Sequence, residues 1–179
     1  MEKKLVLKNE ISEIDTLAVF VRELGEELGL TSDLVFNLNL VLEEAVSNVI
    51  LYAYSKEEQQ EISLSVTASD NDLVFMLIDS GKEFNPAQAP DADVSLPAEE
   101  RRIGGLGIFI IRQIMNKVEY QRIDGKNVLT LGIHLNSDPF YQNSPKTPIS
   151  SMSRHLSQSI SSLELLILSV YDFHLPTLQ

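Results

Sequence analysis

The sequence contains no cysteine, so it can form no disulfide, no thiolate zinc site and no cysteine nucleophile. Its three histidines (His134, His155 and His174) lack the spacing of metal ligands, which favours structural or surface roles. Cationic side chains are scarce, because 14 Lys and Arg stand against 26 Asp and Glu, a formal net charge of −12. Such a surface repels phosphate backbones and anionic lipids, so we expect no nucleic-acid partner and no membrane partner.

Long apolar runs are also absent. No stretch of 18 consecutive apolar residues occurs, and residues 1–7 lack the apolar segment of a secretory signal. The composition, 44% apolar and 22% charged, is that of an ordinary globular protein. We therefore expect a soluble, cytoplasmic protein, whose 179 residues suffice for one domain with a hydrophobic core and an appendage.

Two helices are predicted in the first third of the chain. Apolar residues recur at helical spacing over residues 14–28, where Ser12 can cap the helix in an approximate capping box and Gly29 can end it. A second helix is predicted over residues 31–53. It is apolar almost all round, which indicates that it is buried on both sides.

The later elements are strands in pairs and one further helix. Residues 4–8 predict an edge strand, the alternation at 62–68 a half-buried strand, and the apolar run at 73–78 a central strand. A third helix and two strands that meet at the turn Asp124-Gly125 follow, at residues 106–117, 118–123 and 128–135. Adjacent strand pairs predict an α+β fold, a two-layer sandwich of a mostly antiparallel sheet with helices on one face.

Two stretches fall outside this regular pattern. Residues 79–104 contain three prolines and little periodicity, which predicts a long loop, and we expect its part at 87–103 to act as a lid. The segment after Asn136 is first rich in serine and then apolar, as in a linker or tail. We therefore divide the chain into a domain at residues 1–136 and a segment of unknown role at 137–179.

Three motifs carry the chemistry. They are residues 43–48 (Glu-Glu-Ala-Val-Ser-Asn), 79–86 (Asp-Ser-Gly-Lys-Glu-Phe-Asn-Pro) and 104–109 (Gly-Gly-Leu-Gly-Ile-Phe). The first has a carboxylate and an amide four residues apart in a helix, the second an aspartate at a strand end, and the third a glycine cluster that opens a helix. Each is weak evidence by itself, but in this order they predict a nucleotide-binding site.

These motifs resemble the N, G1 and G2 boxes of the GHKL (Bergerat-fold) ATPases, and most closely those of the anti-sigma-factor serine kinases of bacterial partner-switching systems. The resemblance covers about residues 5–135. It implies a Bergerat fold that uses ATP and Mg²⁺. It also implies that the protein phosphorylates a serine of an antagonist protein and binds a sigma factor. Relatives commonly dimerise, so a homodimer is a further expectation.

The resemblance assigns two roles within the second helix. Asn48 would offer its amide oxygen to Mg²⁺, a cation that prefers oxygen ligands and retains water and substrate phosphates. Glu44 lies one helical turn earlier on the same face and would act as the catalytic base for the attacking hydroxyl. The alternative is that both are polar groups at a helix–sheet boundary. Glu43 faces about 100° away and is interpreted as a surface residue.

The other two motifs would hold the nucleotide. In the family, an aspartate at the position of Asp79 accepts a hydrogen bond from the adenine amino group, and Gly81 lets the backbone turn close beneath the base. The backbone N–H groups of the third motif would bind the triphosphate where the helix dipole favours negative charge. This motif comprises Gly104, Gly105, Leu106 and Gly107. A solvent-facing turn and a simple tight turn are the respective alternatives.

The sequence departs from the family pattern at three positions. Asn85, Ile103 and Tyr52 stand where relatives often have aspartate, arginine and histidine, respectively. Arg101 and Arg102 precede the glycines, and either could reach the γ-phosphate or a partner, so no catalytic arginine is assigned. Asn85 can make the same turn-type hydrogen bonds as an aspartate, whereas the role of Tyr52 stays open.

Two other functions compete with the serine kinase. A binding module could hold ATP as a structural ligand and only sequester partners. The catalytic domain of a histidine kinase would need a phosphoacceptor histidine in a preceding helical hairpin, and no histidine precedes His134. The carboxylate of Glu44 favours the serine kinase over the binding module.

Overall fold

The apolar run at residues 73–78 forms the central strand of a five-stranded antiparallel sheet. The structure is a computed structural model and describes residues 1–55, 58–86 and 106–135. The strand order is β1-β2-β3-β5-β4. The strands are β1 (Glu2–Lys8), β2 (Glu61–Ala68), β3 (Asp72–Asp79), β4 (Lys117–Ile123) and β5 (Lys126–His134).

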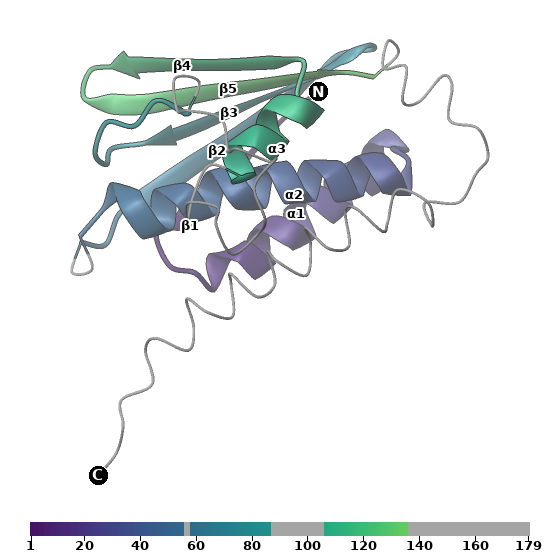
Figure 1. Ribbon diagram of the computed structural model, residues 1–179. Coiled ribbons are helices and arrows are strands. Elements are labelled where there is room, and N and C mark those ends of the chain that lie inside the picture. Colours follow the sequence, from purple (N-terminus) through teal and green to yellow (C-terminus); the bar gives the residue numbers. More distant parts are fainter. Residues whose placement is uncertain (56–57, 87–105, 136–179) are drawn as a thin grey trace, which may run out of the picture. The chain divides into compact units, whose positions relative to one another are not determined.

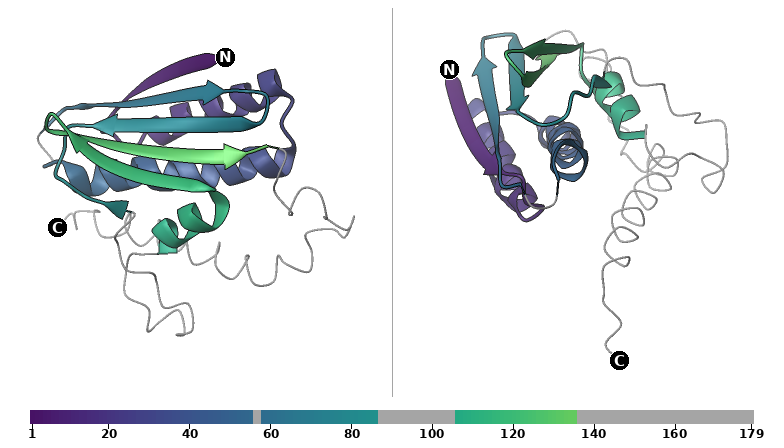
Figure 2. Two further views of the ribbon diagram at one scale, coloured as in Figure 1. Left: turned by 90° about the horizontal axis from the view of Figure 1, so that it is seen from above. Right: turned by 90° about the vertical axis from the view of Figure 1, so that its left-hand side faces the viewer.

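Three helices cover one face of this sheet (Figure 1). They are α1 (Glu13–Leu28), α2 (Ser32–Asn48) and α3 (Leu106–Ile114). Helix α2 packs against both α1 and α3, so it is the middle helix of the layer (Figure 2). The predicted α+β two-layer sandwich is confirmed, and the sheet is antiparallel throughout.

The side chains of β3 and β5 that face the helices form the centre of the core. Along β3 every second residue from Leu73 is buried, and along β5 every second residue from Asn127. Both rows are apolar except for one residue each, Asp79 at the end of β3 and Asn127 near the start of β5. In the described part of the chain these are the two buried polar side chains, so the hydrophobic core ends at a polar site.

The ends of the first two helices differ in how they are capped. Gly29 adopts the left-handed conformation, φ 63°, and ends α1 as predicted. The predicted cap at Ser12 is wrong, because this residue has helical dihedral angles and its side chain makes no capping hydrogen bond. At α2, in contrast, the hydroxyl of Thr31 accepts a hydrogen bond from the backbone N–H of Leu34 at 3.3 Å.

Helix α2 continues as a single π-helical turn, η1 (Val49–Ala53), directly after Asn48. The predicted burial on both sides is only partly correct, because Phe36, Leu51 and Tyr52 are exposed. Among the described residues, the continuous helix Ser32–Ala53 is long and apolar enough to cross a membrane. The core helix of an α+β domain has the same properties, and here Leu38, Leu42 and four other α2 side chains are buried.

Several predicted boundaries shift by a few residues. The third helix ends at Ile114 instead of residue 117, and β5 begins at Lys126 instead of residue 128, so that Asn127 belongs to the sheet. The turn between β4 and β5 has positive φ angles at both Asp124 and Gly125, as a tight two-residue hairpin requires. The predicted lid at 87–103 and the segment at 137–179 lie outside the described residues.

The contrast between the two helix caps can be tested directly. Thr31→Ala should lower the free energy of unfolding by about 1 kcal/mol, because the N–H of Leu34 loses its acceptor. Ser12→Ala is the matched control and should leave it within about 0.5 kcal/mol, since this hydroxyl caps nothing. Urea denaturation of the two variants gives both values. Equal losses would contradict the assignment of the caps.

Candidate functional site

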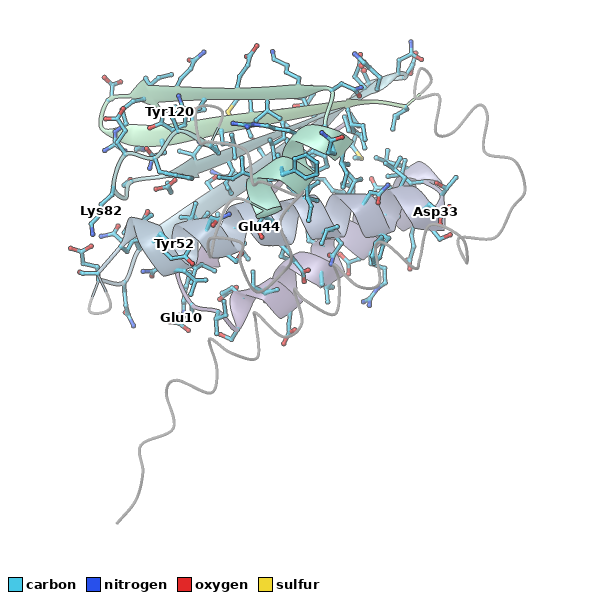
Figure 3. The ribbon with its side chains drawn as sticks, viewed as in Figure 1. Glu10, Asp33, Glu44, Tyr52, Lys82 and Tyr120 are labelled. Atoms are coloured by element: carbon cyan, nitrogen blue, oxygen red, sulfur yellow. The ribbon has the colours of Figure 1, made fainter. Side chains whose placement is uncertain are left out.

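Glu44 and Asn48 form a hydrogen-bonded pair on one face of α2. The amide nitrogen of Asn48 donates to Oε1 of Glu44 at 2.6 Å and to the backbone carbonyl of Glu44 at 2.8 Å. Glu44 lies between Asp33 and Tyr52 along this helix, beside α3 (Figure 3). The amide nitrogen is engaged by Glu44, so the amide oxygen is the atom that Asn48 can offer to a ligand.

The start of α3 lies against the carboxylate of Glu44. A Cβ atom added at Gly107 would lie 1.8 Å from the carboxyl carbon of Glu44 and 1.9 Å from Oε1. A larger side chain at this position would force the carboxylate of Glu44 to move away. Gly107 therefore allows the first turn of α3 to approach a carboxylate that belongs to α2, and the two motifs predicted to cooperate do meet.

This contact changes the acidity of Glu44. Burial raises the pKa of its carboxyl above the ordinary value of 4.5, and the hydrogen bond from Asn48 opposes that rise. A carboxylate with a raised pKa is a better proton acceptor at neutral pH than an exposed one. The direction of the shift is the one that the predicted role of Glu44 as a base requires.

Glu43, interpreted from the sequence as a surface residue, is half-buried instead. Burial raises the pKa of its carboxyl, a hydrogen bond with Asn39 lowers it, and the nearby charge of Asp15 raises it further. The prediction was wrong because α1 packs beside α2 and covers part of this side chain. The charge effect of Asp15 places Glu43 near α1.

Asp79 lies at the end of β3, at the boundary of the core. Its Oδ1 accepts hydrogen bonds from the backbone N–H of Gly81 and from the amide of Asn127, both at 2.8 Å. Asp79 is 5% exposed, which excludes the alternative of a solvent-facing turn aspartate. A buried strand-end carboxylate that accepts these bonds can also accept one from a ligand donor.

The segment after Asp79 is tied to the end of α2. The backbone N–H of Lys82 donates to the carbonyl of Ala53 at 2.8 Å, and the N–H of Ser80 donates to the hydroxyl of Tyr54 at 2.8 Å. A Cβ at Gly81 would lie 2.5 Å from that of Ala53. Gly81 is therefore required for this close approach of the two backbones, whereas the sequence attributed it to a turn beneath a base.

The remaining predicted site residues are only partly described. Gly104 and Gly105 lie outside the described residues, as do Arg101, Arg102 and Ile103, and the side chain of Leu106 is not described either. Tyr52 is 66% exposed on η1, so it does not join the pair formed by Glu44 and Asn48. The structure thus brings Glu44, Asn48 and Gly107 together and shows Asp79 and Gly81 as a second group.

Four residues of this second group were missed in the sequence. Asn127 is 5% exposed and bonded to Asp79, Tyr120 and Arg122 bond to Asn127, and Tyr54 holds Ser80. One signal was available for Asn127, because it is a polar residue in register with the buried positions of its strand. The turn at Asp124-Gly125 also pairs Asn127 with Arg122.

Two further observations concern metal ligands and the surface outside the pair Glu44–Asn48. Within the described residues no three His, Cys, Asp or Glu side chains gather in a way that could hold a metal. A hollow that involves neither Glu44 nor Gly107 is lined by three lysines and reaches Asp79 and Ser80. These lysines are Lys4, Lys8 and Lys126.

Comparison with known proteins shows to which family the chain belongs. The model of the family "Histidine kinase-like ATPase domain" matches residues 7–133. The chain belongs to this family. The match spans all three helices and almost the whole sheet, and it confirms the resemblance to the GHKL ATPases.

Similar proteins have been named as protein kinases. Serine/threonine-protein kinase BtrW of Bordetella bronchiseptica is 30% identical over 99 residues, 55% of this chain and 70% of that protein. Serine-protein kinase RsbW of Bacillus cereus (strain AH820) is 26% identical over 133 residues, 72% of this chain and 81% of that protein. A crystal structure of the RsbU and RsbW domains of Rv1364c from Mycobacterium tuberculosis matches 75% of this chain. Its TM-score is 0.55 at 15% identity, and the match spans 32% of that longer chain, which supports the fold alone.

The raised pKa of Glu44 predicts how stability depends on pH. The folded state ionises this carboxyl at higher pH than the unfolded chain, so its burial destabilises the fold above the folded pKa and costs nothing below 4.5. Glu44→Gln should therefore raise Tm relative to the wild type at pH 8, and this difference should vanish near pH 4. Thermal unfolding measured by circular dichroism across this range tests it, with the exposed Glu23→Gln on α1 as control. A constant difference at all pH values would contradict the burial of an ionised Glu44.

Proposed function

We propose that this protein is an ATP- and Mg²⁺-dependent serine protein kinase of the anti-sigma type. It transfers the γ-phosphoryl group of ATP to a serine of an antagonist protein, and in its other state it binds a sigma factor. The observation that carries the proposal is the carboxylate of Glu44, held by Asn48 against Gly107 at the start of α3. The names of the relatives, serine kinases BtrW and RsbW, agree with this chemistry.

Asn48 is suited to hold the metal ion. Its amide nitrogen donates to Glu44, which leaves the amide oxygen as a neutral hard ligand. When bound, Mg²⁺ would neutralise charge on the phosphates of the substrate. Gly107 would contribute its backbone N–H at a helix start, where an anion is favoured, together with the undescribed Gly104, Gly105 and the N–H of Leu106.

Glu44 is suited to act as the base. It accepts the proton of the serine hydroxyl as the serine oxygen forms its bond to the γ-phosphorus and the bond from that phosphorus to the β–γ bridging oxygen breaks. ADP leaves with the bridging oxygen. Burial raises the pKa of Glu44 toward neutral pH. A base whose pKa lies nearer to the working pH accepts a proton more effectively than an exposed glutamate does. Most of the catalysis comes from positioning and charge neutralisation, which a small site can supply.

Asp79 is suited to select the base of the nucleotide. Its buried carboxylate at the end of β3 accepts hydrogen bonds, and the amino group of adenine is a donor. We also propose that the protein is cytoplasmic and that it forms a homodimer. The first proposal is in line with the acidic composition, a net charge of −12, and the second with the dimers that relatives commonly form. Both are independent of the catalytic assignment.

A phosphorylation assay separates the kinase from a module that only holds ATP. The purified protein is incubated with γ-labelled ATP, Mg²⁺ and a candidate antagonist protein from the neighbouring genes. The kinase transfers label to a serine, which phosphopeptide mass spectrometry identifies. ATP that stays bound without label transfer would favour the sequestering module, and label on a histidine of another protein would favour a histidine kinase.

Asp79→Asn should weaken ATP binding about tenfold or more. An asparagine can satisfy Asn127 and the N–H of Gly81 only with its oxygen, so its amide nitrogen then faces the adenine donor. Losing one buried hydrogen bond costs about 1–3 kcal/mol. Isothermal titration calorimetry on a variant shown to be folded provides the test. Unchanged affinity would remove Asp79 from the site.

Glu44→Gln should retain nucleotide binding but lower phosphoryl transfer by about 10²–10⁴-fold, because only the proton acceptor is lost. Asn48→Ala, in contrast, should weaken the Mg²⁺-dependent part of ATP binding itself. Single-turnover phosphorylation together with calorimetry distinguishes the two effects. A wild-type transfer rate in Glu44→Gln would contradict its role as the base.

A further inference from the structure

We propose that Asn127 is a positioning residue that fixes the orientation of Asp79 and thereby sets the preference for adenine over guanine. This inference rests on the proposed function, since it takes Asp79 to be the group that meets the base. It concerns a residue on β5, outside all three sequence motifs. Asn127 stands in the middle of a row of three polar side chains that crosses the sheet.

Asp79, Asn127 and Arg122 are direct neighbours on three adjacent strands. In the register of the sheet, Asp79 of β3 pairs with Asn127 of β5, and Asn127 pairs with Arg122 of β4. The rows that contain Asp79 and Asn127 face the helices. Figure 3 labels Tyr120 on β4 and Lys82 in the segment after β3, both at the end of the sheet where this row lies.

The amide of Asn127 uses all of its hydrogen-bonding capacity. Its nitrogen donates to Oδ1 of Asp79 at 2.8 Å and to the carbonyl of Lys82 at 2.9 Å. Its oxygen accepts from the hydroxyl of Tyr120 at 2.7 Å and from Nη1 of Arg122 at 2.6 Å. A flipped amide would set oxygen against two acceptors and N–H₂ against two donors, so the orientation of this side chain is fixed.

A fixed amide in turn fixes the carboxylate of Asp79. Oδ1 receives two hydrogen bonds, from Asn127 and from the N–H of Gly81, so Oδ2 is the oxygen with more capacity for a ligand donor. The hydroxyl of Tyr54 also hydrogen bonds with Asp79, and that contact helps to raise the pKa of Tyr54, after the larger effect of burial. Asp79 is thus held by Asn127 of the sheet and by Tyr54, which directly follows η1.

Orientation matters because the two purines differ at one edge. Adenine has an amino donor where guanine has a carbonyl acceptor, so a carboxylate aimed at this position attracts adenine and repels guanine. A carboxylate free to turn could instead accept from the ring N–H and the amino group of guanine. Selectivity therefore needs both the acceptor and its restraint, and Asn127 supplies the restraint.

Asn127 also has a structural role, which the experiment must separate. Its bond to the carbonyl of Lys82 and the bond from Arg122 to the carbonyl of Gly81 at 2.9 Å hold the segment after β3. Loss of this support alone would lower affinity for every nucleotide alike. Loss of the restraint on Asp79 would change the ratio of the affinities for adenine and guanine nucleotides.

The test is calorimetric titration of the full chain with Mg²⁺-ADP and Mg²⁺-GDP. Asn127→Ala should weaken the binding of ADP about tenfold and leave the binding of GDP unchanged or slightly tighter. The ratio of ADP affinity to GDP affinity should therefore fall about tenfold or more. Tyr120→Phe removes only one bond to the amide oxygen and should lower the ratio about threefold. Asn9→Ala is the matched control, because this asparagine also bridges backbone groups, those of Glu58 and Gln60, and should leave the ratio unchanged.

The outcomes are distinguishable. Equal loss of ADP and GDP affinity in Asn127→Ala, or an unchanged ratio in Tyr120→Phe, overturns the proposal, and the second variant decides if the first does not fold. A wild type that binds neither nucleotide overturns the proposed function as well. If the wild type prefers ADP and loses that preference in Asp79→Asn but not in Asn127→Ala, the proposed function stands and the role of Asn127 fails.

Discussion

The site depends on one contact, that between the carboxylate of Glu44 and the backbone of Gly107. The carboxylate of Glu44 lies on the side of α2 that meets α3 and is partly buried, and burial raises its pKa. Glycine at the start of α3 leaves room for it, whereas a larger side chain there would have to displace the carboxylate. The same contact brings the helix that carries Asn48 beside the helix start that carries the glycine motif, so the proposed base and the proposed anion site share one boundary.

Helix α2 also connects this boundary to the second group around Asp79. Its π-helical end, η1, delivers the carbonyl of Ala53 to the N–H of Lys82, and Tyr54 follows to hold Ser80. Such turns are often found at functional sites. From there the hydrogen bonds run through Asn127 to the edge strand β4. A single continuous helix thus fixes the spacing between the pair Glu44–Asn48 and the carboxylate at the strand end.

Much of the fold was predictable, because helical and alternating patterns follow directly from which face each element buries. The turn at Asp124-Gly125 and the end of α1 at Gly29 were predictable from backbone preference. What failed depends on packing: Ser12 looks like a cap but makes no bond, and Glu43 is covered by α1. Asn127 was missed because its partners come from β3, from the segment after β3 and from β4, and the register between β3 and β5 is not visible in one sequence.

Paramagnetic broadening tests the central claim most directly, that the nucleotide and its metal lie between α2 and α3. Mn²⁺ with ADP can replace Mg²⁺ on isotope-labelled protein, since both prefer oxygen ligands. The account predicts that the NMR signals of the Asn48 side-chain amide and of the Gly107 backbone broaden only when ADP is present. Signals of Lys4 and Lys8 should stay sharp. Broadening centred on Lys4 and Lys8, with Asn48 unaffected, would contradict it.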